Sequence, residues 1–434
     1  MHGPKRIFQG KGRAMGFWVM MCTVAMALLI FQTVQLLTIY FSKPTLSQVS
    51  FIVNDTGLHF PAITICNFNP IKKSHVRELN ASGDLSGETL QYFLLTNADA
   101  MTIYSNPDRG KLKRDNDMAE EYIKNHTDFK ITHFLKTAGY ECEEMFKKCY
   151  FGGRRFECCQ LMKPIITGLG KCFQLDLGHR GHEWMRKQKW PGVEAGLQII
   201  ADAHLEEVLS KSTDSAGPIF SNLFENGFRY YVHDVSQVPY LSSEGVSASP
   251  STTVYSAIKT STHQLLTVDE WGNCTRDWPP GYRTSLQYSA QSCKYLCLAD
   301  HFMKMCNCSP FTYNIDGKRP ICTPLQTVTC MGQNMGPFVN GSQSLNLPEC
   351  GECRMECEST SYHAYNSYGN GFNEGALFWM QQNSENVTDE HIKKNYVIIN
   401  IFFREMFYTA YTQVTATSLT EILSRFFVKF SFYL

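Results

Sequence analysis

The sequence has no excess of positive charge, because 40 lysines and arginines balance 40 aspartates and glutamates. A chain without such an excess has no broad electrostatic attraction to phosphate backbones, so we expect no nucleic acid as a partner. The motifs of nucleotide loops, zinc proteases and serine hydrolases are missing as well: there is no G-x-x-x-x-G-K-[ST], no H-E-x-x-H and no G-x-S-x-G. We therefore predict a protein that is not an enzyme and that needs no cofactor.

Long hydrophobic runs are scarce too, and a mean hydropathy of −0.24 argues against a protein with many membrane spans. One uncharged run stands out, from Gly16 to Phe41. About 20 apolar residues are enough to cross a bilayer, and Trp18 and Tyr40 suit its two interfaces. A signal peptide is the rival interpretation, but its hydrophobic region is about 7–15 residues long and ends in a small-residue cleavage site. The length of the run favours a transmembrane helix.

The flanks of this run predict its orientation. Four cations precede it, whereas Lys43 is the only one in the first stretch after it. By the positive-inside rule, the N-terminus lies in the cytosol and the residues after position 42 lie outside the cell. Polar residues within the run serve either helix–helix hydrogen bonds or a pore-facing stripe, and the sequence does not separate the two: Gln32, Thr33, Gln35 and Thr38.

Cysteine is concentrated in one stretch. Ten of the 17 cysteines lie between Cys274 and Cys357, and such a stretch must be tied by disulfides or by metal. Sixteen lie beyond the hydrophobic run, and Cys22 lies within it. An oxidising extracellular compartment favours disulfides over thiolate metal sites. Seven N-x-S/T sequons on the same side are predicted glycosylation sites: Asn54, Asn80, Asn125, Asn273, Asn307, Asn340 and Asn386.

The remaining chain mixes strand and helix patterns. The residues at 60–67 alternate as in a half-buried strand, and Asn226-Gly227 is a turn that leads into another. The helix expected at 285–301 would place Cys293 and Cys297 one turn apart on one face. The segment 406–415 is expected to pair with 396–403. Further strands are expected at 50–53, 191–200, 228–234 and 251–268, and further helices at 71–79 and 117–124.

Several motifs together resemble the degenerin / epithelial sodium channel / acid-sensing ion channel family, with the invertebrate degenerins as the nearest branch. The resemblance covers roughly residues 1–424. It rests on segments that are similar to the cytosolic gating motif, the palm strands, the finger and β-ball, and the start of the thumb of this family: His2-Gly3, Phe60 to Asn67, Gly170 to Phe173, Gly196-Leu197, Gly245 to Thr253, Trp271 to Cys274 and Tyr396 to Phe403.

The resemblance implies an α+β membrane protein. An N-terminal cytoplasmic arm (1–15) and a transmembrane helix (16–41) would precede a large disulfide-rich extracellular domain (42–424) made of a palm β-sheet, a finger, a β-ball and a helical thumb (274–357).

It also implies a disulfide map. In the thumb the pairs would be Cys274–Cys357, Cys293–Cys353, Cys297–Cys350, Cys306–Cys330 and Cys308–Cys322. Cys66–Cys172 would tie palm to finger. Cys149 would pair with Cys158 or Cys159, which leaves the other of these two to bond Cys142.

The C-terminal residues depart from the family pattern. Members carry a second transmembrane helix with a selectivity filter, whereas here the divergent tail 425–434 is too short and too charged to cross a bilayer. We expect a subunit of an amiloride-sensitive, extracellularly gated sodium channel in the plasma membrane. The channel would be a homo- or hetero-trimer that contacts lipid and passes sodium ions. The chain as given would lack its own pore helix. The alternative is a single-pass membrane glycoprotein that acts as a non-conducting or dominant-negative partner. No motif selects the gating stimulus.

Overall fold

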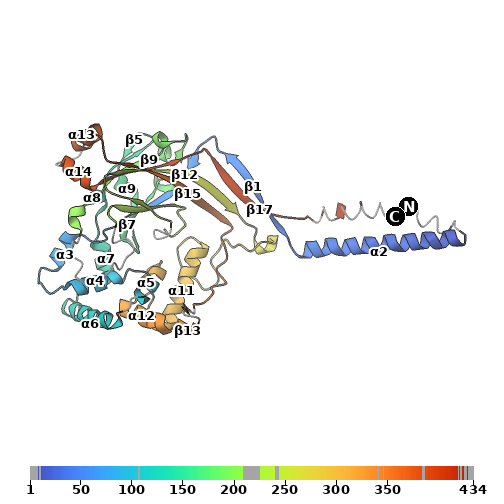
Figure 1. The fold of residues 1–434 in the computed structure, drawn as a ribbon, viewed down its shortest axis with the longest axis horizontal. Helices are drawn as coiled ribbons and strands as arrows, with labels where there is room; N and C mark the ends of the chain where they lie inside the picture. Colours follow the sequence, from blue (N-terminus) through green and yellow to red (C-terminus); the bar gives the residue numbers. More distant parts are fainter. Residues whose placement is uncertain are drawn as a thin grey trace.

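The structure is a computed structural model. It describes residues 8, 11–105, 108–208, 225–239, 244–333, 335–339, 342–345, 347–383, 387–418, 420, 423, 424 and 428. One long helix, α2 (Arg13–Phe41), projects from an α+β body formed by residues 45–415 (Figure 1). The mixed fold agrees with the α+β class expected from the sequence. The predicted tail 425–434 falls almost wholly outside the described residues, so the expectation about a missing pore helix stays untested.

Helix α2 begins at Arg13, three residues before the predicted start, and ends at the predicted Phe41. Within the described parts of the chain, it is the one helix long and apolar enough to cross a membrane. Most of its side chains are exposed, as expected for a surface that faces lipid. Two of the polar groups bond their own helix: the Thr33 and Thr38 hydroxyls donate to the carbonyls of Leu29 at 2.7 Å and Val34 at 2.8 Å.

The body is built on a large sheet of eight strands. Seven of them follow the order β1-β17-β12-β16-β9-β4-β5, and β15 pairs with β12 off this path. The strands are β1 (Thr45–Val53), β17 (Phe407–Thr415), β12 (Thr252–Gln264), β16 (Tyr396–Phe403), β9 (Leu197–Asp202), β4 (Phe146–Phe151), β5 (Arg154–Phe156) and β15 (Glu358–Asn370).

The predicted pairing of 406–415 with 396–403 is wrong, because the two strands follow one another along the same edge of β12. The first part of β12, Thr252–Ile258, pairs with β16, and its last part, Ser261–Gln264, pairs with β17. Both pairings are parallel, so the chain passes from β16 to β17 without reversing direction. A hairpin would need that reversal. The 13-residue length of β12 lets one strand serve both partners in succession.

A small sheet of five strands has the order β11-β10-β3-β7-β6. Its strands are β11 (Val246–Ala248), β10 (Phe228–His233), β3 (Ala62–Asn67), β7 (Gly170–Asp176) and β6 (Met162–Thr167). The central strand β3 is buried along its whole length, whereas its sequence predicts a half-buried strand. One face joins the main core through Ile63 and Ile65, and Cys66 on the other face packs with Cys172 and Tyr231. Short pairs complete the β-structure: β2 (Leu58–His59) with β8 (Lys187–Gln188), and β13 (Met335–Val339) with β14 (Ser342–Leu345).

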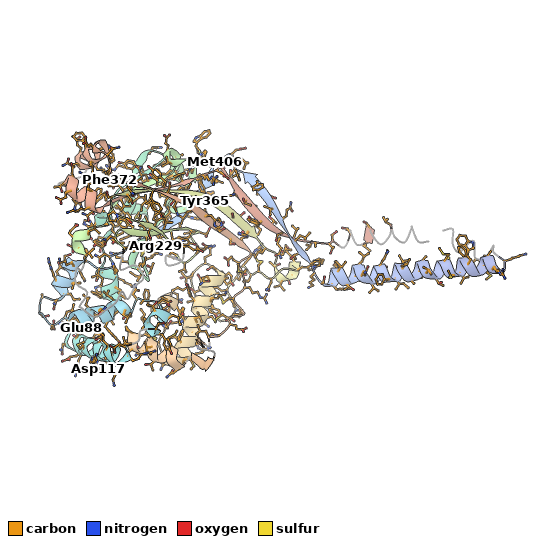
Figure 2. The ribbon with its side chains drawn as sticks, in the orientation of Figure 1. Glu88, Asp117, Arg229, Tyr365, Phe372 and Met406 are labelled. Carbon is orange, nitrogen blue, oxygen red and sulfur yellow. A yellow bond between two sulfur atoms is a disulfide. The ribbon has the colours of Figure 1, made fainter. Side chains whose placement is uncertain are left out.

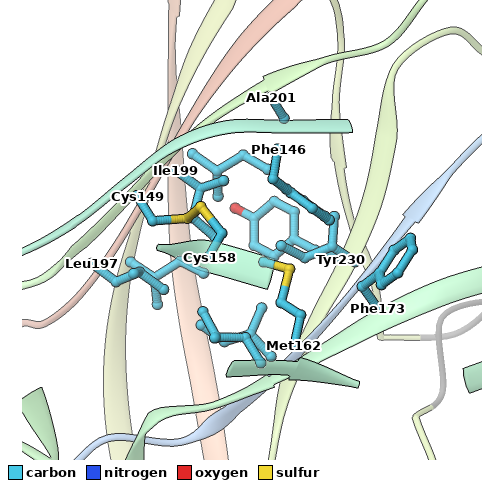
Figure 3. Close-up of a cluster of buried hydrophobic side chains, with 14 of the residues drawn as sticks. Phe146, Cys149, Cys158, Met162, Phe173, Leu197, Ile199, Ala201 and Tyr230 are labelled. Carbon is cyan, nitrogen blue, oxygen red and sulfur yellow. A yellow bond between two sulfur atoms is a disulfide. The ribbon is translucent and has the colours of Figure 1, made fainter. Parts of the chain in front are cut away.

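The two sheets share one hydrophobic core (Figure 3). The large sheet contributes Phe146 and Ile199, and the small sheet contributes Phe173 and Tyr230. The Tyr230 hydroxyl lies 2.6 Å from the Ser256 hydroxyl, so this buried polar group has a partner inside the core. The Cys149–Cys158 disulfide lies at the edge of the same cluster (Figure 3).

Helices cover one side of the body. Glu88 and Asp117 mark this helical layer in Figure 2, away from Phe372 and Met406 on the sheet side. Its inner faces pack aromatic residues together, including Phe93 and Phe129 with ring centroids 4.8 Å apart. The layer comprises α3 (Lys73–Leu79), α4 (Gly87–Leu95), α5 (Ala100–Tyr104), α6 (Arg109–Asn125), α7 (Ile131–Thr137), α11 (Ala290–Cys306) and α12 (Pro324–Gln333).

The remaining helices are short. The α-helices are α8 (Cys142–Met145), α9 (Cys158–Leu161), α10 (Leu177–Arg180), α13 (Glu374–Gln382) and α14 (Asp389–Asn395). The 3-10 helices are η1 (Glu183–Met185), η2 (Val193–Ala195), η3 (Leu205–Glu207), η4 (Val268–Glu270) and η5 (Phe311–Tyr313).

A buried histidine in the small sheet predicts how stability depends on pH. His233 is 1% exposed, with Nε2 2.9 Å from the Thr64 hydroxyl, and burial lowers the pKa of its imidazole below the ordinary 6.5. As pH falls through about 6.5, the unfolded chain takes up this proton before the folded chain does, so the folded state loses stability. We expect the loss to reach at most about 1.4 kcal/mol per pH unit for this one group.

Thermal unfolding of the detergent-solubilised chain at a series of pH values checks this slope. His233→Gln should flatten it, whereas His363→Gln, at an exposed position, should leave it unchanged. Equal slopes in the wild type and His233→Gln would show that His233 does not contribute.

Candidate functional site

The cysteine-rich segment Cys274–Cys357 is braced by five disulfides. They are Cys274–Cys357, Cys293–Cys353, Cys297–Cys350, Cys306–Cys330 and Cys308–Cys322, the same pairs that the family resemblance implies. Each closes a loop within the segment, so each restricts the unfolded chain and stabilises by typically about 2–4 kcal/mol. The five cross-links therefore hold the segment together as one covalently braced unit.

Helix α11 carries two of these cysteines on its buried face. The helix spans Ala290–Cys306, displaced from the predicted 285–301, because Ser289 caps it: its hydroxyl accepts a hydrogen bond from the Ser292 amide at 3.1 Å. At the other end Asn307 adopts a left-handed conformation with φ 55°, which ends the helix. Cys293 and Cys297 face Cys353 and Cys350, as their one-turn spacing predicts.

Aromatic side chains cover these two disulfides. Trp278, Tyr282 and Tyr288 pack with the four sulfur-bearing residues in one cluster. The Trp278 indole donates to the Leu286 carbonyl at 2.8 Å, and the Tyr282 hydroxyl donates to Glu352 at 3.0 Å. Burial, together with the neighbouring carboxylate, raises the pKa of Tyr282, so its phenol stays protonated as a donor.

Three disulfides lie outside this segment. Cys142 bonds Cys159, and Cys149 bonds Cys158, so the structure selects one of the two alternatives left open by the adjacent cysteines. Cys66 and Cys172 occupy opposite positions on β3 and β7. This disulfide joins neighbouring strands of the small sheet, and the expectation that it ties palm to finger stays a prediction. Cys22 in α2 is the free cysteine of the described residues.

The loop that leads into the cysteine-rich segment meets the membrane helix at an aromatic contact. Tyr40, in the last turn of α2, and Trp271, three residues before Cys274, pack edge to face with ring centroids 5.0 Å apart. Both side chains are half-buried. We call the residues around this contact the joint: Tyr40, Thr45, Leu266, Trp271, Gly272 and Gln413.

A tight loop presents Trp271 to the helix. Trp271 has a left-handed backbone with φ 75°, and the next amide, of Gly272, donates to the Thr267 carbonyl at 2.8 Å. A Cβ atom on Gly272 would lie 1.8 Å from the Leu266 carbonyl oxygen, so only glycine fits. Leu265 and Cys357 are joined by a backbone hydrogen bond of 2.8 Å, which places the last residue of the segment beside the same loop.

Gln413 connects this loop to the strands nearest the membrane. Its amide oxygen accepts from the Leu266 backbone at 3.0 Å, and its amide nitrogen donates to the Thr45 hydroxyl at 2.8 Å. Thr45 begins β1, directly after α2, and Gln413 lies in β17. One side chain thus links the loop before the cysteine-rich segment to β1 and β17. Sequence reasoning missed it, since a polar residue in a strand pattern gives no signal of distant partners.

The joint has the geometry of a mechanical link. A displacement of the braced segment would act on α2 through Trp271 and Tyr40, and on β1 and β17 through Gln413. The described joint residues offer no nucleophile paired with a base.

The other predicted site residues are distributed over the body. Asn125, Asn273 and Asn307 are exposed, and Asn54 and Asn80 are half-buried, with side-chain oxygens that accept backbone hydrogen bonds from Thr56 and Leu85. Asn340 and Asn386 lie outside the described residues, as do His2 and Gly3 of the predicted gating motif.

Comparison with known proteins gives consistent matches over almost the whole chain. A family profile described as "Amiloride-sensitive sodium channel" matches residues 1–434. The Bile acid-sensitive ion channel of Mus musculus is 26% identical over 432 residues, which cover 98% of this chain and 80% of that protein. The Acid-sensing ion channel 2 of Homo sapiens is 24% identical over 411 residues, covering 94% of this chain and 75% of that protein.

A solved structure described as a cryo-EM structure of a proton-activated chloride channel covers 96% of this chain and 91% of its own, with a TM-score of 0.32 and 7% identity. That TM-score is too low to support an inference.

Proposed function

The chain belongs to the amiloride-sensitive sodium channel family, and we propose that it is a subunit of an extracellularly gated sodium channel of the plasma membrane. Members of this family are ion channels rather than enzymes, which confirms the prediction that the chain is not an enzyme. The observation that carries the proposal is the joint, where the loop that leads into a disulfide-braced segment contacts the end of a membrane-length helix. The finer assignment to an invertebrate degenerin branch stays a prediction.

The proposed topology places the N-terminus in the cytosol and the body outside the cell. The basic residues before α2 support this orientation by the positive-inside rule. The eight disulfides support it too, because such bonds persist in oxidising compartments. The sequons of the body are then accessible to glycosylation, with Asn125, Asn273 and Asn307 the most exposed of those described.

In the proposed mechanism, an extracellular stimulus displaces the cysteine-rich segment as a unit. The joint passes the displacement to α2 and to the β1–β17 pair, and sodium passes through a pore assembled from three subunits, either copies of this chain or other family members. The names of the relatives suggest acid and bile acids as the first stimuli to try. No described residue selects between them.

Co-expression tests the proposal. The chain is expressed in oocytes alone and together with a full-length family member, and amiloride-blockable sodium current, surface delivery and complex formation are measured. A subunit should form a complex and change the current. Suppression of the current within that complex would identify the alternative, a non-conducting partner. No complex and an unaltered current would contradict the proposal.

Trp271→Ala is expected to shift gating in that assay without removing the protein from the surface. An edge-to-face aromatic pair is worth about 0.5–1.5 kcal/mol, which corresponds to a roughly 2–12-fold change in a two-state equilibrium. We expect a change of that size in the ratio of open to closed channels at a fixed, half-activating stimulus. Trp271→Phe should retain most of the wild-type response.

The matched control is Trp190→Ala, since Trp190 is 74% exposed and lies far from Tyr40 in sequence. The same shift in Trp190→Ala, or none in Trp271→Ala, would rule out the joint as the path of coupling.

A further inference from the structure

Three potential metal ligands converge where β9 ends. Asp202 is the last residue of β9, His204 follows it in a left-handed turn, and His391 comes from α14. One ligand atom from each lies within 4.8 Å of the other two. The Asp202 carboxylate oxygen Oδ2 lies 2.9 Å from His391 Nε2 and 3.6 Å from His204 Nε2. The cluster joins residues that are 189 positions apart in the sequence.

The donor set has the chemistry of a transition-metal site. Imidazole nitrogen and carboxylate oxygen are ligands for zinc, and sites with three protein ligands leave a fourth position for water. Calcium instead needs six to eight oxygen ligands, which this cluster does not offer. The side chain of Asp202 is 2% exposed, whereas those of His204 and His391 are 20% and 28% exposed, so an ion can enter from the histidine side.

The surroundings of His204 support metal binding through its Nε2 atom. Its other ring nitrogen, Nδ1, lies 2.9 Å from the Glu206 carboxylate. A carboxylate in this position holds the proton on Nδ1, as in carboxylate–histidine–zinc arrangements. Stacking on Tyr140, with ring planes 17° apart, fixes the orientation of the imidazole.

Two contacts must change when an ion binds. His204 Nε2 donates to the Glu144 carbonyl at 2.9 Å, so it must leave this bond and release its proton to solvent before it can bind the ion. The His391 proton must move from Nε2 to Nδ1, and the Asn395 amide, 3.2 Å from Nδ1, keeps its second acceptor, the His391 carbonyl at 3.1 Å. Lys147 also competes for the site, because its ammonium lies 3.7 Å from Asp202 Oδ2 and repels a second cation.

We propose that Asp202, His204 and His391 form a binding site for Zn²⁺ on the body. An ion there would tie α14, which leads directly into β16, to the end of β9. The cluster lies where α8 and α14 border the large sheet (Figure 1). All sixteen cysteines outside α2 are in disulfides, so thiolates do not compete for the ion within the described body. The proposal rests on this geometry alone and stands or falls independently of the channel function.

Isothermal titration of the full-length chain in detergent, stripped with a chelator and then titrated with ZnCl₂, tests the site. We expect one Zn²⁺ ion to bind per chain and to raise the melting temperature. CaCl₂ should neither bind at this site nor raise the melting temperature. His391→Ala and His204→Gln should abolish this binding. Glu206→Gln should weaken it by about 10–100-fold, as loss of a supporting carboxylate does elsewhere.

If a histidine variant fails to fold, Lys147→Gln still tests the site. The Lys147→Gln protein should bind zinc more tightly than the wild type. The matched control is His133→Asn, an exposed histidine on α7, which should bind as the wild type does. Wild-type zinc affinity in His391→Ala, or unchanged affinity in both Lys147→Gln and Glu206→Gln, would overturn the proposal.

Discussion

The double variant Cys66→Ser/Cys172→Ser should lose about 4.7 kcal/mol of unfolding free energy, because this disulfide joins residues 106 positions apart and the loop-entropy cost grows with loop length. The substitution itself is mild. Both sulfurs are buried, and the Thr167 hydroxyl, 3.0 Å from Cys172 Sγ, can bond a serine placed there. Domains are stabilised by about 5–15 kcal/mol, so at the low end of this range the variant would be close to unfolding, and we expect less mature protein at the cell surface.

The matched comparison is Cys308→Ser/Cys322→Ser, whose disulfide spans only 14 positions and should cost about 3 kcal/mol. Both losses are measured by denaturant unfolding of the purified full-length chain under non-reducing conditions. If the short-loop variant proved as unstable as the long-loop variant, loop entropy would not be the source of stability in this body.

Gly272→Ala should disrupt the joint more severely than any substitution of Trp271. The added methyl group would lie 1.8 Å from the Leu266 carbonyl oxygen, and backbone atoms cannot move aside as a flexible side chain can. Overpacking in a well-packed region costs about 1–3 kcal/mol, and a clash with backbone should exceed that range. The loop must therefore open, which breaks the hydrogen bond from Leu266 to Gln413 and withdraws Trp271 from Tyr40.

Melting temperature and surface delivery of the full-length chain measure this effect. Gly351→Ala, in the neighbouring cysteine-rich segment, is the control, because an added Cβ meets no atom within 4 Å there. We expect the control to behave as the wild type. A Gly272→Ala protein with an unchanged melting temperature would mean that the loop adopts another conformation.

Features that depend on local pattern were predictable from the sequence. The uncharged run from Gly16 to Phe41 gave α2 to within three residues, because length and apolarity alone define a membrane-length helix. The spacing of Cys293 and Cys297 placed both on one face of α11. The disulfide pairs did not follow from spacing. They came from the family resemblance, and the structure contains the same pairs.

Features that depend on distant partners were not predictable from one sequence. The contact between Gln413 and Thr45 spans 368 positions, and no local property of either residue predicts this contact. The succession of β16 and β17 along one edge of β12 is of the same kind, since neighbouring strands usually pair and only the whole sheet shows the exception. The Asp202–His391 contact was missed for this reason as well.

The pairing of β1 with β17 also determines when the body can finish folding. Thr45 to Val53 cannot pair until Phe407 to Thr415 have been synthesised, about 350 residues later. At about 5–20 residues per second, synthesis leaves roughly 20–70 s in which α2 has been made while its adjoining strand has no partner. During that interval β1 has an unpaired edge, which is a template for pairing with another chain. β17, the last of the described strands to be synthesised, therefore completes the large sheet at β1, the strand that follows the membrane helix.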